Sequence, residues 1–114
     1  MTLDFGEDIL TVNAGKHDWS IPYDQIISLE LVENTNFGTL REGSEKRKLH
    51  YGFYENEQRE QYTLCIDPRI ENCVAIETND GFFILNYENR DSTQELYIMF
   101  AEFLSHKTDT ILDK

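Results

Sequence analysis

Residues 73–104 constrain the fold more than any other part of the chain, because they predict a β-hairpin that leads directly into the strongest helix signal. Val74 and Ile76 alternate with their neighbours as residues of a strand do, and residues 82–87 form a second β-rich run. Residues 79–81, between the two runs, read Asn-Asp-Gly, which is the composition of a tight turn. The last third of the chain therefore predicts two antiparallel strands and a helix that closes the domain.

The helix is predicted from a start signal and an apolar stripe. Ser92 and Glu95 have the spacing of a capping box, in which each side chain accepts a hydrogen bond from the other residue's backbone amide. Residues 108–114 are expected to fray. Apolar residues recur at intervals of three and four, which predicts that one helix face packs on the core: Leu96, Met99, Phe100, Phe103 and, on the flank, Leu104.

The upstream residues predict short strands that this helix covers. In the run 23–33, Ile27, Leu29 and Leu31 are expected to face inward. Residues 34–48 hold two glycines and no sustained periodicity, so they predict a long loop or a loosely paired hairpin end. Period-two alternation marks five runs before the last hairpin, at residues 8–13, 17–21, 23–33, 49–54 and 61–67.

Together with the last hairpin, these runs give about seven strands followed by one helix. This pattern is typical of a mainly β fold, a small antiparallel barrel of about seven strands (two packed sheets) capped by one C-terminal amphipathic helix. The chain has 114 residues and fits one domain, 1–114, since two halves would each be too small to bury a useful core.

Charge and hydropathy narrow the classes of function. The net charge of −12 repels nucleic acids and anionic bilayers, so neither is an expected partner. No stretch approaches the ~18 consecutive apolar residues that a membrane span needs. The N-terminal residues also lack the basic start and apolar core of a secretory signal, so a cytoplasmic protein is expected.

Residues that carry chemistry do not form a recognisable constellation. Cys65 and Cys73 lack Cys-x-x-Cys spacing and are expected to be free thiols, although neighbouring strands would bring them close enough to be bridged. His17, His50 and His106 fall on three separate predicted elements without ligand spacing. Signatures of serine nucleophiles, nucleotide loops and zinc proteases are absent from the sequence. We therefore expect no enzyme activity, no metal and no cofactor.

Three segments carry a resemblance to a known family. The stretch WSIPYDQIISLELV, the strand HYGFY followed by QYTLCI, and the pair CVAIETNDGFFILN resemble bacterial pleckstrin-homology (PH-like) domains. The resemblance covers about residues 16–104. It implies a PH-like fold, and it implies a groove between the strand at 60–67 and the C-terminal helix, where an extended peptide can add to the sheet.

Four of the ten basic residues gather in the loop 41–48, at Arg41, Lys46, Arg47 and Lys48. Lysine and arginine side chains on a loop can converge on a phosphate, an acidic peptide or a lipid headgroup. The same residues can instead guard a strand edge against aggregation, or pair with nearby carboxylates. The loop is thus one candidate binding site, for an anion or a partner.

The second candidate is the peptide or assembly groove, with Tyr62 on its strand wall and Tyr97, Ile98 and Ala101 on its helix wall. These three helix residues widen the apolar arc beyond what one face requires. The extra apolar surface could equally be covered by the segment around Leu3 and Phe5, or by a second copy of the chain.

The sequence thus favours a non-catalytic binding or assembly module, with a protein partner or a second copy of itself as ligand. The alternative is a receptor for an anionic small molecule or a phosphorylated headgroup, held by Arg41, Lys46, Arg47 and Lys48. An enzyme is the least favoured class.

Overall fold

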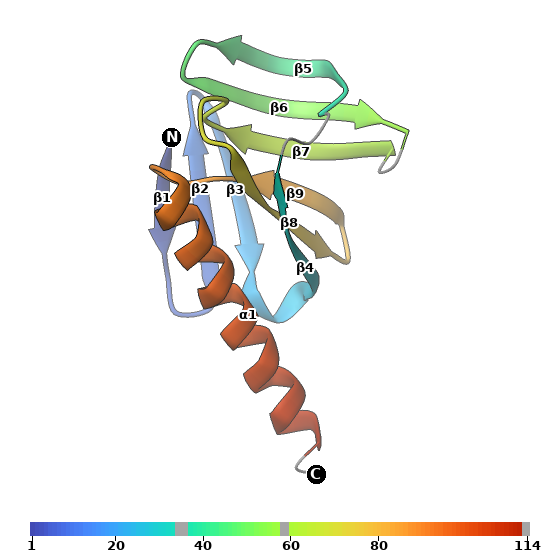
Figure 1. Cartoon of the computed structure of the whole chain (residues 1–114). Coiled ribbons are helices and arrows are strands. Elements are labelled where there is room, and N and C mark those ends of the chain that lie inside the picture. Colours follow the sequence, from blue (N-terminus) through green and yellow to red (C-terminus); the bar gives the residue numbers. More distant parts are fainter. Residues whose placement is uncertain (34–36, 58–59, 113–114) are drawn as a thin grey trace.

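The computed structural model describes residues 1–33, 37–57 and 60–112, with the side chains of the helix described as far as Ser105. Within these residues the chain forms two β-sheets and one C-terminal helix, which confirms the predicted mainly β class (Figure 1). The described part contains nine strands rather than about seven, and the two sheets are not closed into a barrel.

The small sheet is an antiparallel meander of three strands in the order β1-β2-β3. Its strands are β1 (Thr2–Phe5), β2 (Ile9–Ala14) and β3 (His17–Pro22). Gly15 turns the chain between β2 and β3 with a φ of 59°, a left-handed conformation that glycine adopts without a steric penalty. The strands predicted at 8–13 and 17–21 are confirmed as β2 and β3, whereas β1 was not predicted.

The large sheet has the order β4-β8-β9-β7-β6-β5. A single-turn helix, η1 (Tyr23–Gln25), leads the chain from the small sheet into it. Neighbouring strands are antiparallel except β7 and β9, whose parallel pairing departs from the all-antiparallel arrangement that was predicted. Its strands are β4 (Ile26–Glu33), β5 (Thr39–Lys46), β6 (Leu49–Asn56), β7 (Glu60–Ile66), β8 (Asn72–Thr78) and β9 (Gly81–Leu85).

The large sheet buries apolar side chains on both faces, which explains why its central strands β8 and β9 are almost continuously buried. One face packs on β2, β3 and α1 (Arg90–Leu112) through a cluster that includes Leu10, Val74, Leu85 and Phe100. The other face holds a separate cluster built from these buried residues: Tyr54, Tyr62, Leu64, Ile66, Cys73, Ala75 and Ile84.

The helix α1 begins earlier than predicted. The side-chain oxygen of Asn89 accepts a hydrogen bond from the Ser92 amide at 2.9 Å, so Asn89 caps a helix that starts at Arg90. The capping box predicted on Ser92 and Glu95 is therefore wrong. The backbone is helical to Leu112, and residues 113–114 lie outside the described residues. The fraying expected over residues 108–114 stays a prediction.

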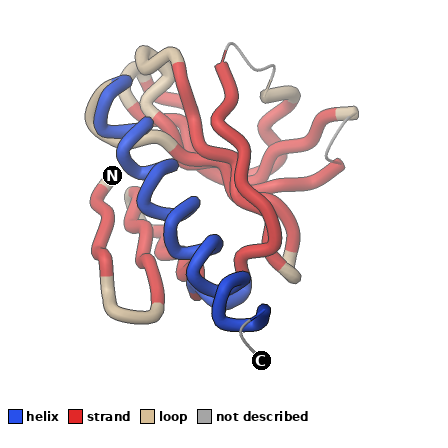
Figure 2. The backbone as a smooth tube through the Cα atoms, turned by 60° about the horizontal axis from the view of Figure 1, so that its bottom comes forward, coloured by secondary structure: helices blue, strands red, loops and turns tan. Residues whose placement is uncertain are grey.

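Only part of the predicted apolar stripe of α1 enters the core. Leu96 and Phe100 are buried, but Met99 and Phe103 each keep 38% of their surface exposed. The helix lies across the side of the molecule where the two sheets meet (Figure 2), and its C-terminal part extends past the strands (Figure 1). Its apolar stripe is therefore longer and wider than the surface that receives it.

Two details of the large sheet were left open or predicted wrongly from the sequence. Of the two alternatives for residues 34–48, the hairpin forms and the long loop does not, since residues 39–46 are the strand β5 and pair with β6; residues 34–36 lie outside the described residues. In β4, a register shift between Ile26 and Ser28 turns Ile27 outward, and it is 54% exposed. Leu29 and Leu31 pack against the core as predicted.

Candidate binding groove

The structure separates the four basic residues that the sequence grouped together. Arg41 lies near the start of β5, where its Nε is 2.5 Å from a carboxylate oxygen of Glu55. Lys46, Arg47 and Lys48 lie at the opposite end of β5, at the turn into β6. Five residues of extended chain span about 17 Å, so Arg41 cannot join the other three around one small anion.

The predicted groove residues are also divided. Tyr62 belongs to the cluster on the far face of the large sheet, and its hydroxyl donates to the carbonyl of Phe37. Tyr97 packs against the cluster on the helix side, while Ile98 is 46% exposed and Ala101 is partly buried. The sheet stands between Tyr62 and the three helix residues, so the structure does not bring these four side chains together.

The cysteines are free, as predicted, and both are buried. β9 lies between their strands, and the two side chains belong to different clusters on opposite faces of the sheet, so they cannot be bridged. Burial raises the pKa of both the Cys65 and the Cys73 thiols to about 12, which leaves them neutral and unreactive near pH 7.

The histidines serve structural contacts where they are described. His17 stacks on Trp19 with ring centroids 5.5 Å apart, and His50 Nδ1 lies 3.5 Å from a carboxylate oxygen of Glu45. The side chain of His106 lies outside the described residues. The described residues contain no group of three or more histidine, cysteine, aspartate or glutamate side chains that could hold a metal ion.

The outer strand of the small sheet, β1, borders two pockets on the helix side of the molecule. One, of about 420 Å³, is lined by residues 1–3 together with Lys48, Leu49, Asp67, Tyr87 and Glu88. The other, of about 370 Å³, lies between Phe5 and the first turns of α1, where Ser92, Glu95, Leu96 and Met99 line it. Tyr87 and Glu88 line both pockets, so the two form one groove along β1, hereafter the β1 groove.

The groove floor follows from the alternation of β1. Leu3 pairs with Val12 and Phe5 with Leu10, and both partners on β2 are buried in the core on the helix side. Leu3 and Phe5 therefore face the same side as these partners, and Phe5 reaches Tyr87 with ring centroids 6.3 Å apart. Phe5 is nevertheless 43% exposed, so this face of β1 is only partly covered.

The wall between the two pockets is held in an unusual backbone conformation. Glu88 has a φ of 56°, a region that residues other than glycine rarely adopt. Hydrogen bonding of the Tyr87 hydroxyl to Glu88 raises the pKa of Tyr87. Strained residues of this kind are often found at functional sites, and Glu88, one of two such non-glycine residues among those described, lines the groove.

Buried polar contacts support this wall from behind. The side-chain amide of Asn86 donates through Nδ2 to the backbone carbonyl of Asp67 at 2.9 Å, and its Oδ1 accepts from the backbone amide of Asp67 at 2.8 Å. The Tyr87 amide donates to the buried Thr93 hydroxyl at 3.0 Å, and that hydroxyl also lies 2.9 Å from the carbonyl of Asn89. The end of β9, the end of β7 and the first turn of α1 are thus joined directly beneath Glu88.

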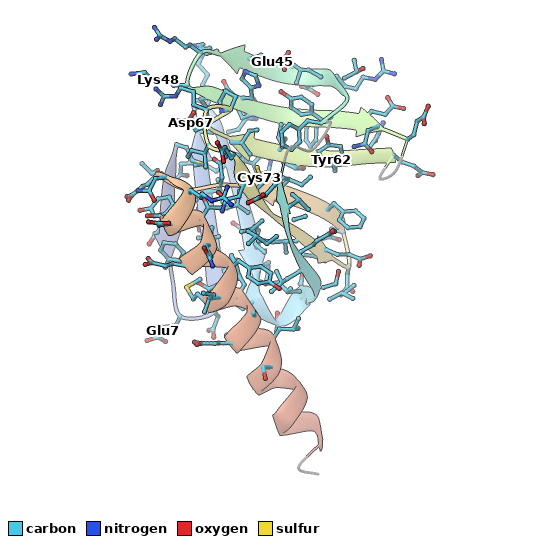
Figure 3. All side chains as sticks on the ribbon, in the orientation of Figure 1. Glu7, Glu45, Lys48, Tyr62, Asp67 and Cys73 are labelled. Atoms are coloured by element: carbon cyan, nitrogen blue, oxygen red, sulfur yellow. The ribbon has the colours of Figure 1, made fainter. Side chains whose placement is uncertain are left out.

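The charges around the groove are unevenly placed. Glu88 and Glu95 are exposed at the Phe5 end. At the other end, Lys48 and Asp67 lie near each other (Figure 3), and Arg69 hydrogen-bonds the Asp67 carboxylate at 2.7 Å, which lowers the pKa of that carboxyl. The Phe5 end therefore carries negative charge that no cation among its lining residues balances.

Comparison with protein-family models, with curated proteins and with solved structures found no match to this chain. Among the described residues, no helix is both long enough and apolar enough to cross a bilayer. The resemblance to PH-like domains accordingly stays a prediction.

Sequence reasoning missed Phe5, Tyr87, Glu88 and Met99 as members of one site. A signal existed for Phe5, because the N-terminal segment was a candidate to cover the extra apolar surface of the helix. No pattern in the sequence joins residue 5 to residues 87, 88 and 99, since only the packing of α1 beside β1 brings them together.

Proposed function

We propose that this chain is a non-catalytic, PH-like binding module that takes an extended segment of a protein partner into the β1 groove. The proposal includes a cytoplasmic location and no cofactor. It moves the ligand from the strand and helix walls predicted from the sequence to β1 and the first turns of α1.

The observation that carries the proposal is the combination of a sheet edge with two adjoining pockets. Among the described residues β1 pairs with β2 alone, so its other edge can pair with an added strand. Edge pairing supplies backbone hydrogen bonds, and pockets beside the edge select alternate side chains. Phe5 and Met99 supply exposed apolar surface where such a strand would lie.

The basic residues do not support the anion-receptor alternative in the same way. Arg41 is paired with Glu55, and the pocket that Lys48 lines also contains the carboxylates of Asp67 and Glu88. A phosphate at this place would meet the Asp67 and Glu88 carboxylates as well as Lys48.

Site-specific photo-crosslinking in cells that express the protein tests the proposal. A photoreactive phenylalanine analogue at position 5 is expected to form a discrete adduct, and the crosslink is expected to map to one linear segment of the partner. Phe53 on β6 is the matched control, because it is the same residue type with the same 43% exposure outside the groove. Adducts of equal yield at both positions, or none at position 5, would contradict the proposal.

A further inference from the structure

We infer that the segment bound in the β1 groove is a strand with a large apolar residue and, two positions away, a lysine or arginine. This inference rests on the proposed function and specifies the chemistry of the partner. It follows from three properties of the groove: its strand edge, its apolar pocket and its acidic rim.

The strand edge sets the spacing of the two side chains. A strand added beside β1 directs alternate residues toward the helix side, about 7 Å apart along the chain. The side chains on that side would meet the surface that Leu3 and Phe5 already share. Two adjacent pockets joined through Tyr87 and Glu88 therefore suit residues at positions i and i+2 of the partner.

The pocket at the Phe5 end selects the apolar residue. Its lining includes Phe5, Tyr87, Leu96 and Met99, and Leu96 is continuous with the buried core. Burying a leucine- or phenylalanine-sized side chain here would remove apolar surface from water on both partners. Methionine can also adjust its shape to different apolar side chains, which suits a site that accepts more than one.

The rim selects the charge. Glu88 and Glu95 border the apolar pocket, and both are exposed without a cation among the residues that line it. A lysine or arginine two positions from the apolar residue would extend toward Glu88, which lines both pockets, while Glu95 lies on the other side of the apolar pocket. The long-range attraction of a chain with a net charge of −12 would also speed the approach of a basic segment.

The same charges disfavour a second copy of this chain as the occupant. Pairing two β1 strands edge to edge would bring the carboxylates of Asp4, Glu88 and Glu95 in each copy toward those of the other. Both copies would carry a net charge of −12, so the encounter would be repulsive.

A matched set of synthetic peptides tests this inference by fluorescence anisotropy. The parent peptide has eight residues that alternate threonine with valine, except for one leucine and, two positions later, one lysine. One variant peptide carries glutamate in place of the lysine, and another carries serine in place of the leucine. We expect each variant peptide to bind at least tenfold more weakly than the parent, and binding of the parent to weaken with added salt.

Variants of the protein assign the effect to the rim. The double variant Glu88→Gln, Glu95→Gln is expected to lose most of the preference for lysine over glutamate. The matched control is Glu42→Gln, which removes an exposed carboxylate from β5, outside the groove, and is expected to keep the preference.

The outcomes separate the inference from the proposed function. If the lysine and glutamate peptides bind equally well at the groove, the inference is wrong and the proposed function stands. If no peptide binds but crosslinking at position 5 yields a protein adduct, the chemistry inferred for the partner is again wrong. If neither experiment detects a ligand, both are wrong. A dimer held through β1 in sedimentation would overturn the inference in favour of a second copy.

Discussion

β1 and β5 are both outer strands of their sheets, but their exposed edges differ in length, charge and regularity. β5 has eight residues, and its exposed side chains include Arg41, Glu42, Glu45 and Lys46. A register shift between Leu40 and Glu42 also interrupts its pairing with β6. Charged side chains and bulges are the features by which proteins prevent a strand edge from pairing with other chains.

β1 has few of these features. It has four residues, its one charged side chain is Asp4, and its pairing with β2 runs without a register shift. It also borders two pockets, whereas β5 lines none of the pockets described above. The difference indicates that the charged side chains of β5 protect this edge from pairing with other chains, as was considered for the basic loop. The β1 edge is less protected and is therefore the better candidate for binding.

The largest expected effect concerns how β5 is attached. Gly43 on β5 and Gly52 on β6 face each other with φ values of 144° and 136°, and no side chain fits between them. A Cβ at Gly52 would lie 2.0 Å from the Glu42 carbonyl oxygen. We expect Gly52→Ala to lower the free energy of unfolding by about 3 kcal/mol or more, through backbone strain and the displacement of β5. Urea denaturation measures this loss.

Gly81→Ala is the matched control for this substitution. Gly81 has a φ of 126°, close to that of Gly52, but a Cβ there would meet no atom within 4 Å. The control therefore carries the strain without the collision, and we expect it to cost about 1 to 2 kcal/mol. Equal losses in the two variants would show that close approach of the strands does not hold β5 in place.

The next effect concerns local opening of β1. Cys65 lies on β7 and faces the helix side, where its Sγ is 3.2 Å from the Sδ of Met1, the residue before β1; Cys73 lies on β8 and faces the opposite side of the sheet. Short edge strands open more readily than central ones. We expect pulsed alkylation of the native protein, mapped by mass spectrometry, to label Cys65 at least tenfold faster than Cys73.

Ligand binding provides the control for this prediction. The parent peptide described above is expected to slow labelling of Cys65 and to leave labelling of Cys73 unchanged, because only β1 gains a neighbour. If both thiols react at the same rate, and that rate follows the free energy of global unfolding, then β1 does not open separately. β1 would in that case be as stable as the rest of the molecule.

The smallest effect concerns Asp67, beside β1. Hydrogen bonds from Arg69 lower the pKa of its carboxyl below the unfolded value of about 3.9. The contribution of Asp67 to stability is therefore present above that pH and is lost as the pH falls through the lower, folded-state pKa. We expect Asp67→Asn to lower the Tm at pH 7 by no more than about 4 °C, with the difference shrinking as the pH falls below about 3.9.

Glu55→Gln, which removes the ion pair with Arg41 on the β5 side, is the companion measurement. Both ion pairs lie at the surface, where such pairs contribute little to stability. A fall in Tm much larger than about 4 °C in either variant would therefore show that its ion pair stabilises the strand beside it more than a surface pair is expected to.

The strands that alternate clearly were predictable, because a half-buried strand exposes every second residue. The runs at 8–13, 49–54 and 61–67 and the hairpin through Asn79 and Asp80 all form close to their predicted places. The sequence left β5 open as a loop or a loosely paired hairpin end, because an outer strand with both faces largely exposed needs no apolar alternation. The capping box failed because Asn89, three residues before Ser92, offers an equally good cap, and local spacing alone does not decide between them.

The sequence by itself determined the mainly β class, the last hairpin and the C-terminal helix, because these depend on local periodicity, turn residues and apolar stripes. Tertiary structure decided the strand order, the parallel contact of β7 with β9 and the meeting of Phe5 with Tyr87 and Met99. These three features depend on which apolar surfaces bury each other most completely in the folded chain. Such burial involves residues far apart in the sequence, so no local pattern specifies it. The proposed site belongs to this second group, which is why the predicted groove residues were dispersed while the groove formed at β1.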